Sequence, residues 1–289
     1  MWSLGGLSFY ELLKRTVKES WQDGLFGQSA QLAFYHFMAV FPALLLLLLP
    51  MAYLAKTGAE MRQLLMASFR QFLPEEAAVL VTGTIRDLQV NASSAGGLLL
   101  LAVAGAVWAG INGCWAMIVG LNTAYETRED RRWRDIVRVA AGLAFALLLL
   151  VFAALLVVYY ADLPLRYAAV PAVLMRLAHW IVITAVLLIS FGLYYRFGPN
   201  LKNREWQWST PGAVFGATLW IAATLLVREY FDRFAPYHPV YGRAAAPATL
   251  LMWLYITNAV VLIGAEMNSE IEKADENRGG QQRARGPRK

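Results

Sequence analysis

Apolar residues along the chain gather into six long runs that are separated by polar segments. A helix needs about 20 apolar residues to cross the roughly 30 Å hydrocarbon core of a bilayer. Helices satisfy their own backbone hydrogen bonds where lipid offers no partner. The pattern therefore predicts an all-α integral membrane protein with six transmembrane helices. They are expected at residues 29–54, 97–122, 137–160, 171–197, 211–228 and 245–266.

Two polar segments have the spacing of amphipathic helices. Residues 7–22 place four apolar side chains near one face, with the basic residues elsewhere, which is typical of a helix lying on the membrane surface. These apolar residues are Phe9, Leu13, Val17 and Trp21. The outer loop, residues 55–94, repeats this spacing on both sides of Pro74 and predicts two short amphipathic helices.

The sequence thus divides into three parts. Residues 1–28 form a cytoplasmic N-terminal amphipathic segment, residues 29–270 a six-span membrane domain, and residues 271–289 a tail. The tail ends in NRGGQQRARGPRK, which is basic and of low complexity, so we expect it to be disordered.

Composition and charge support a membrane protein and orient it. Apolar residues make up 58% of the chain and charged residues only 16%, against about 25% charged residues in soluble domains. The side that holds both termini carries about twice as many Lys and Arg as the other side, which predicts cytoplasmic termini. The expected partners are membrane lipids, with anionic headgroups at the cytoplasmic face, and no nucleic acid.

Motifs for enzymatic chemistry are missing from the sequence. The three histidines are scattered without metal-ligand spacing, and nucleotide-binding and nucleophile-elbow motifs are absent. The single cysteine, Cys114, lies in an apolar run. We therefore expect no enzyme, no cofactor and no metal site.

Polar residues inside or at the ends of membrane spans are the candidate functional residues. They fall at three depths. The cytoplasmic-side cluster, a candidate gate or binding site, consists of Gln31, Asn122, Tyr125, Arg196, Asn200, Glu266 and Asn268; the midplane holds Pro42, Asn112 and Asn258; the outer-side cluster consists of Arg176, His179, Tyr230 and Tyr241.

Glu266, in the stretch LIGAEMN, allows two interpretations. The span can simply end there, so that the carboxylate meets water. Alternatively, Glu266 pairs with Arg196, whose span ends on the same side, in an ion pair that marks a gate or polar pathway. Gly264 and Ala265 would let a neighbouring helix approach closely in either case.

The other intramembrane polar residues also keep two interpretations. Arg176 and His179 lie one turn apart and either extend outward to water or form a cationic site for an anionic group. Asn112 and Asn258 either join helices by hydrogen bonds or contact a substrate. Gly212 and Gly216 form a GxxxG pair that favours close packing.

The chain resembles the YihY/BrkB family of bacterial inner-membrane proteins, which were long labelled ribonuclease BN. The stretches that carry the resemblance are LAFYHFMAVFPALLLL, WAGINGCWAMIVGLNTAYE, YYRFGPN, PGAVFGATLW, YGRAAAPATLLMWLY and LIGAEMN. The family pattern maps onto Pro42, Leu121, Asn122, Tyr125, Pro199, Asn200, Gly212, Tyr241, Gly242, Gly264, Glu266 and Asn268, whereas Arg243 stands where the pattern has a small polar residue. The resemblance implies six membrane helices in the bacterial inner membrane and a transport function.

We therefore expect a non-enzymatic, flippase-like transporter of a lipid or an amphipathic anion, because sparse polar groups at midplane suit a substrate with an apolar tail. The alternative is a membrane scaffold that recruits partners for envelope assembly. A ribonuclease, as the old label implies, is the least favoured function because no acid/base or metal-binding residues cluster for phosphodiester cleavage.

Overall fold

A computed structural model describes residues 4–53, 95–167, 172–201, 210–234 and 245–284. Within these ranges the regular structure is entirely helical. The helices are α1 (Phe9–Gln22), α2 (Leu25–Tyr53), α5 (Ala95–Ala124), α6 (Trp133–Tyr167), α7 (Ala172–Phe197), α8 (Pro211–Phe234) and α10 (Ala245–Ala284). The outer loop, residues 55–94, for which we predicted two amphipathic helices, lies outside the described residues.

Each of the six predicted spans coincides with one helix, from α2 to α10. Among the described residues, four helical segments are long and apolar enough to cross a membrane: Val103–Ala124, Trp133–Val157, Leu177–Phe197 and Pro247–Arg278. The segment Pro211–Val227 of α8 is apolar but shorter. The protein is therefore a multi-pass helical membrane protein.

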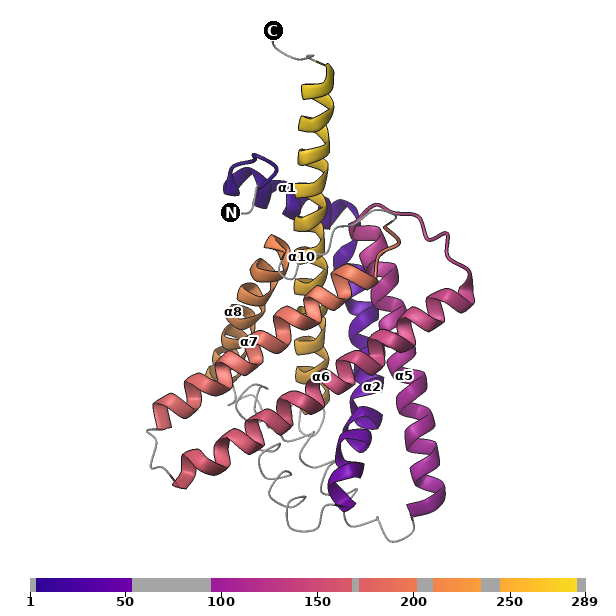
Figure 1. The fold of residues 1–289 in the computed structure, drawn as a ribbon, viewed down its shortest axis with the longest axis vertical. Coiled ribbons are helices and arrows are strands. Elements are labelled where there is room, and N and C mark those ends of the chain that lie inside the picture. Colours follow the sequence, from indigo (N-terminus) through magenta and orange to yellow (C-terminus); the bar gives the residue numbers. More distant parts are fainter. Residues whose placement is uncertain (1–3, 54–94, 168–171, 202–209, 235–244, 285–289) are drawn as a thin grey trace.

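The helices pack in chain order. α2 lies against α5, α5 against α6, α6 against α7, α7 against α8 and α8 against α10, and α10 returns to pack on α2 and α5. Figure 1 shows α1 lying across the bundle at the end where α10 projects beyond the other helices, and both termini lie at this end. We call this the termini end.

Glycines let helices approach closely at the crossing of α8 and α10. A Cβ atom on Gly212 would overlap the carbonyl oxygen of Gly264, and one on Gly264 would overlap the Tyr195 hydroxyl. A Cβ atom on Gly216 would lie 2.8 Å from Cε2 of Phe191 on α7. The GxxxG pair thus contacts two different helices, as small residues at membrane helix interfaces do.

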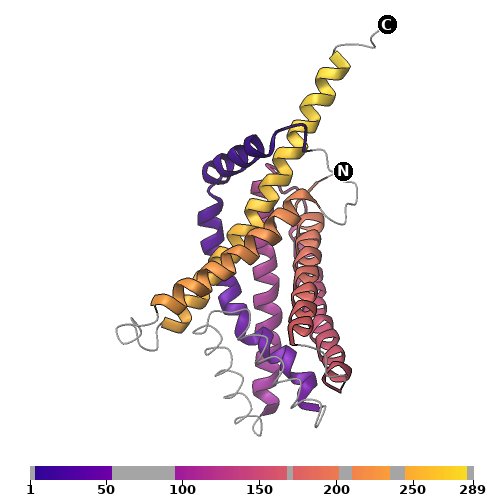
Figure 2. The same ribbon diagram turned by 90° about the vertical axis from the view of Figure 1, so that its left-hand side faces the viewer.

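The amphipathic helix expected at residues 7–22 is α1, shown beside α10 in Figure 2. Its side chains Leu12, Thr16 and Ser20 are buried, and Leu12 packs with Met267 and Ile271 of α10. Of the predicted apolar face, Leu13 packs in part against this cluster and Phe9 contacts Phe215 of α8. Phe9, Val17 and Trp21 nevertheless stay more than half exposed among the described residues.

The prediction of a disordered tail from residue 271 is wrong as far as Ala284, because α10 continues to that residue. Two contacts explain the extension. Ile271 packs against Leu12 of α1, and Lys273 bonds Glu270 one turn earlier, at 2.8 Å. Such pairs stabilise a helix. The helix at the first predicted span also begins earlier than residue 29, at Leu25.

Candidate functional site

Asn268 of the predicted cytoplasmic-side cluster joins α10 to the start of α8. Its Oδ1 accepts a hydrogen bond from the Gly212 N–H at 2.8 Å, and its Nδ2 donates to the Thr210 hydroxyl at 2.9 Å. Thr210 in turn accepts from the Ala213 N–H at 3.2 Å. The first N–H groups of a helix have no partner within it, so Asn268 completes the cap of α8 from another helix. This side chain has a structural role.

Asn122 and Asn200 connect the end of α5 to the end of α7. The Asn122 Oδ1 accepts from the Asn200 N–H at 2.8 Å, and Asn122 Nδ2 donates to Glu129 at 2.7 Å. Arg131 binds both Glu129 oxygens, at 2.8 and 2.6 Å, and donates to the Gly198 carbonyl. Burial raises the pKa of Glu129, but the hydrogen bonds from Arg131 and Asn122 outweigh it, and the pKa lies below its usual value of 4.5.

Tyr125, the other α5-end residue of the predicted cluster, is buried in the main hydrophobic core with Leu121 and Ile118. Arg196 ends α7 and lies 6.0 Å from the centroid of the Phe197 ring. The ion pair between Arg196 and Glu266 is not formed, since neither Glu266 oxygen has a hydrogen-bond partner among the described residues. The structure therefore divides the predicted cluster into separate parts.

Both carboxylate oxygens of Glu266 lack a hydrogen-bond partner among the described residues. Its side chain is 0% exposed and lies on the face of α10 that packs against α2 and α5. The first interpretation from the sequence, a carboxylate that simply meets water, is therefore wrong. A buried carboxylate without a partner is costly, and such groups in membrane proteins mark functional sites.

Charged residues from three elements surround Glu266. Lys273, two turns further along α10, bonds Glu126 at 2.7 Å and Glu270 at 2.8 Å. Asp23, Glu126, Glu270 and Lys273 are the charges that act on the Glu266 carboxylate. Burial, and then the nearby Glu126 carboxylate, raise the pKa of Asp23. The charges that act on Glu266 are thus three carboxylates and one ammonium group.

Backbone geometry places Asp23 and Glu126 at this position. Asp23 caps the end of α1, and Gly24 follows with φ +65°, a left-handed conformation that lets the chain turn into α2. Glu126 has φ +47° just after α5, which is uncommon for a residue with a side chain and is found at functional sites.

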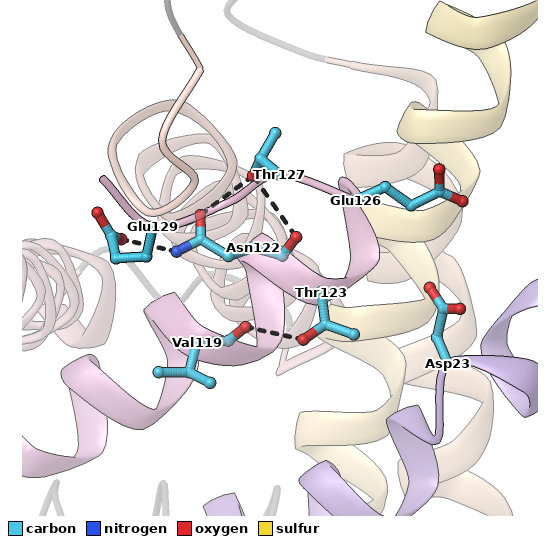
Figure 3. Close-up of a pocket in the computed structure, with 7 residues that line it drawn as sticks. All are labelled: Asp23, Val119, Asn122, Thr123, Glu126, Thr127 and Glu129. Carbon is cyan, nitrogen blue, oxygen red and sulfur yellow. Dashed lines mark hydrogen bonds between the residues drawn. The ribbon is translucent and has the colours of Figure 1, made fainter. Parts of the chain in front are cut away.

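A pocket of about 400 Å³ opens between these residues. Figure 3 shows Glu129 at one end of the pocket, with Asp23 and Glu126 at the other. The lining residues are Asp23, Val119, Asn122, Thr123, Glu126, Thr127 and Glu129. Three of the lining residues are carboxylates, of which Glu126 is paired with Lys273 and Glu129 with Arg131. Asp23 is the lining carboxylate that could contact a group with positive charge or N–H donors.

A second pocket, of about 240 Å³, continues from the first along α2 and α5. Its lining residues are Gln28, Gln31, Tyr35, Asn112, Trp115, Ala116, Val119 and Gly120. The α5 members of both pockets include Asn112, Ala116, Val119 and Thr123, which recur every three or four residues and so lie on one face of the helix. Val119 borders both pockets. We call these two neighbouring pockets the α2–α5 groove.

Two predicted midplane residues lie on different sides of α2. Asn112 lines the second pocket and donates to the Trp108 carbonyl at 2.7 Å. Asn258 is buried, donates to the Leu254 carbonyl at 2.8 Å and hydrogen-bonds His36, so it joins α10 to α2. Pro42 lies within α2, near Gly105 of α5. Of these three, only Asn112 reaches the groove.

The structure does not gather the predicted outer-side residues into one described site. Arg176 and His179 belong to α7, and Tyr230, which is exposed, belongs to α8. Tyr241 lies outside the described residues.

Sequence reasoning missed Asp23, Glu126 and Lys273 as site residues. All three lie beyond the ends of the predicted spans, where a charged side chain is unremarkable. A signal was present in Asp23-Gly24, which marks the end of a helix. Within the residues that the structure describes, no group of three or more His, Cys, Asp or Glu side chains could hold a metal ion.

Comparisons with known proteins place these features in a wider group. A family described as virulence factor BrkB matches residues 16–287. The ribonuclease-like protein YfkH of Bacillus subtilis (strain 168) is 30% identical over 255 residues, which cover 86% of this chain and 90% of YfkH. A UPF0761 membrane protein of Tolumonas auensis is 24% identical over 262 residues, covering 89% and 84% of the two chains. No solved structure matches.

Proposed function

The chain belongs to the virulence factor BrkB family, as the sequence resemblance predicted, and we propose that it transports a lipid-like amphipathic substrate along the α2–α5 groove. The observation that carries the proposal is the pair of pockets that meet at Val119. Together they would offer both polar and apolar contacts along the side of the bundle, from the termini end toward midplane.

A path of this kind suits a lipid because it offers polar contacts to the headgroup and apolar contacts to the acyl chains. A headgroup that crosses hydrocarbon unaided loses its hydrogen bonds to water, which is costly. The amide and hydroxyl groups of Gln31, Tyr35 and Asn112 would replace them. Exposed apolar side chains on the same two helices, such as Phe34 and Trp108, would contact the acyl chains.

The charge of the groove refines the substrate class that the sequence suggested. Asp23, Glu126 and Glu129 line its mouth at the termini end. Glu126 and Glu129 are paired with Lys273 and Arg131, so the Asp23 carboxylate is the one that would attract an amine and repel an anion. We therefore favour a headgroup that carries a positive charge, as in an aminophospholipid, over the amphipathic anion expected from the sequence.

The same proposal places the protein in the bacterial inner membrane with its termini in the cytoplasm. The exposed apolar face of α1, including Phe9 and Trp21, then contacts lipid at the inner surface. The Lys and Arg excess at the termini side favours this orientation and contact with anionic headgroups.

Reconstituted protein tests the proposal directly. Vesicles would contain phosphatidylethanolamine that carries a fluorophore on its acyl chain, and a membrane-impermeant quencher would report its crossing. We expect Val119→Trp to slow crossing at least tenfold, because the side chain fills the junction of the two pockets. Val107→Trp is the matched control, since Val107 lies on α5 outside both pockets and is equally exposed, 51% against 50%.

Three outcomes are informative. If the wild-type protein does not accelerate the crossing of any labelled phospholipid, this contradicts lipid transport. Equal effects of the two tryptophans contradict the groove as the path. Faster crossing of phosphatidylglycerol than of phosphatidylethanolamine contradicts the refinement toward a positively charged headgroup.

The scaffold alternative is supported by the charged end of α10, which projects beyond the bundle (Figure 1). α10 contacts the segment that precedes α1 as far along as Arg278, which donates to the Gly6 carbonyl. Deletion of residues 279–289 therefore separates the two functions without disturbing this contact. Loss of cellular function with intact lipid crossing would favour a scaffold.

We propose no enzymatic activity for this chain, although its relative YfkH is named ribonuclease-like. Purified protein incubated with RNA and Mg²⁺ is expected to leave the RNA intact. Cleavage that a point substitution abolishes would overturn this.

A further inference from the structure

Four buried oxygen acceptors without a hydrogen-bond partner lie where α10 meets α2 and the end of α1. They are both carboxylate oxygens of Glu266, Oε1 of Gln28 and Oδ2 of Asp23. Buried polar atoms in proteins are almost always hydrogen-bonded. The buried Ser20 hydroxyl, three residues before Asp23, also has no partner. Unmatched oxygen atoms from three parts of the chain indicate that a partner with positive charge belongs among them.

Contacts above and below Glu266 show that it faces this region. Residues spaced by four share one face of a helix, and Asn258, Leu262, Glu266 and Glu270 form such a stripe on α10. Asn258 bonds His36 of α2. At the other end of the stripe, Glu270 bonds Lys273, which also bonds Glu126 beside α5. Glu266 lies between these two anchored levels.

Gln28 lies at the level just below Glu266. A Cβ atom added to Gly120 of α5 would lie 3.2 Å from the Gln28 Oε1 and 3.0 Å from the Leu262 Cδ2. Gln28 and Leu262 therefore lie at the same level of the bundle. Gln28 Nε2 donates to the Thr123 hydroxyl at 3.1 Å, which fixes the amide so that its oxygen points away from that bond. Glu266 is one turn of α10 from Leu262, toward Asp23.

The neighbouring cation does not complete this set. Lys273 is bound to Glu126 and Glu270, and neither Glu266 oxygen accepts from it. A proton on Glu266 would supply one O–H donor and leave acceptors of Gln28 or Asp23 unmatched. A small hard cation prefers oxygen ligands and can contact several at once.

We propose that Glu266 is the central ligand of a binding site for a monovalent cation of the size of Na⁺, with Gln28 and Asp23 as supporting ligands. One positive charge neutralises the one fully buried carboxylate. The site lies beside the α2–α5 groove, since Gln28 lines the second pocket and Asp23 the first. Binding there would couple an ion to transport; that coupling rests on the proposed function, whereas the binding itself does not.

The test measures the melting temperature of the full-length purified protein in NaCl and in choline chloride at equal ionic strength and constant pH. A ligand that binds the folded state raises its stability with concentration. We expect a saturable rise of about 3 °C or more with Na⁺. The rise should be absent in Glu266→Gln and retained in Glu272→Gln, which removes the same charge from an exposed position on α10.

Glu266→Gln is expected to fold, because it replaces a buried charge by a neutral side chain of similar shape. Its melting temperature in choline should be at or above that of the wild type. Gln28→Met, which keeps the length but removes the amide oxygen, is expected to weaken the apparent Na⁺ affinity several-fold. This second variant tests the site without changing any charge.

Equal melting in Na⁺ and choline would overturn the proposal, as would a Na⁺ effect that persists in Glu266→Gln. Stabilisation that follows pH and not Na⁺ would also overturn it, since Glu266 would then simply be protonated. The outcome is separable from lipid crossing. Na⁺ binding without lipid transport refutes the proposed function alone, and transport without Na⁺ binding refutes the site alone.

Discussion

Asn268 and Glu266 are two residues apart on α10, yet their surroundings differ completely. Asn268 faces α8, where each of its polar atoms has a partner and glycines bring the backbones into contact. Glu266 faces α2 and α5, where its oxygens have none. One face of α10 therefore forms a helix–helix contact in which the polar groups are hydrogen-bonded. The other face, beside the groove, has polar groups without hydrogen-bond partners. The contrast teaches that a polar cluster read from sequence can contain both kinds of residue.

The strongest test of the structural face is Gly264→Ala. The added methyl group would overlap Tyr195 and the Gly212 backbone, and overpacking costs typically about 1–3 kcal/mol, occasionally more. We expect a sharp loss of folded protein, measured by size-exclusion chromatography and thermal melting. Gly142→Ala on α6, where a Cβ atom meets nothing within 4 Å, is the control and should be neutral or stabilising.

Asn268→Ala should destabilise the fold by about 1–2 kcal/mol, because it leaves the Gly212 N–H and the Thr210 hydroxyl without their partner. Asn277→Ala, at an exposed position on the same helix, should change the melting temperature little. Equal effects of the two substitutions would show that the hydrogen bonds of Asn268 to Gly212 and Thr210 do not contribute to the stability of the fold.

Glu266→Gln should have the reverse profile. We expect intact folding but about a tenfold loss of lipid crossing, equivalent to about 1.4 kcal/mol. Glu272→Gln should leave crossing unchanged. If both variants transport normally, the contrast between the two faces of α10 has no functional meaning.

Glu129 and Asp23, two carboxylates near the groove mouth, should affect stability in opposite directions as the pH changes. The pKa of Glu129 is below its usual value, so its charge stabilises the fold above about pH 4.5 and this contribution is lost as pH falls through the folded pKa. Glu129→Gln should therefore cost on the order of 1 kcal/mol at neutral pH. In acid, its stability should approach that of the wild type.

Asp23 has the opposite sign, because its pKa is raised. Its charged form is disfavoured in the fold, so the contribution of Asp23 to stability rises as pH falls through its folded pKa. Asp23→Asn should be slightly more stable than the wild type at neutral pH, and the difference should vanish in acid. Chemical denaturation across pH measures both variants, and a shift of the same sign in both would contradict this assignment.

Local patterns determined the helices of this protein and its membrane character. Apolar runs of sufficient length predict helices wherever they occur, and each predicted span coincides with a helix. The same patterns marked Glu266 as unusual. They misjudged the tail, because Ile271 is held by Leu12 of α1, a contact that no local pattern contains.

Only the tertiary structure decided which polar side chains hydrogen-bond to another helix and which have no hydrogen-bond partner. Asn122 bonds a residue 78 positions away, and Asn268 one 56 positions away. Such bonds depend on which helix faces meet, and the face that a residue presents to a distant helix is set by packing and not by its neighbours in the chain. For that reason the acidic mouth of the groove, with Asp23 and Glu126, became visible only when the helices were assembled.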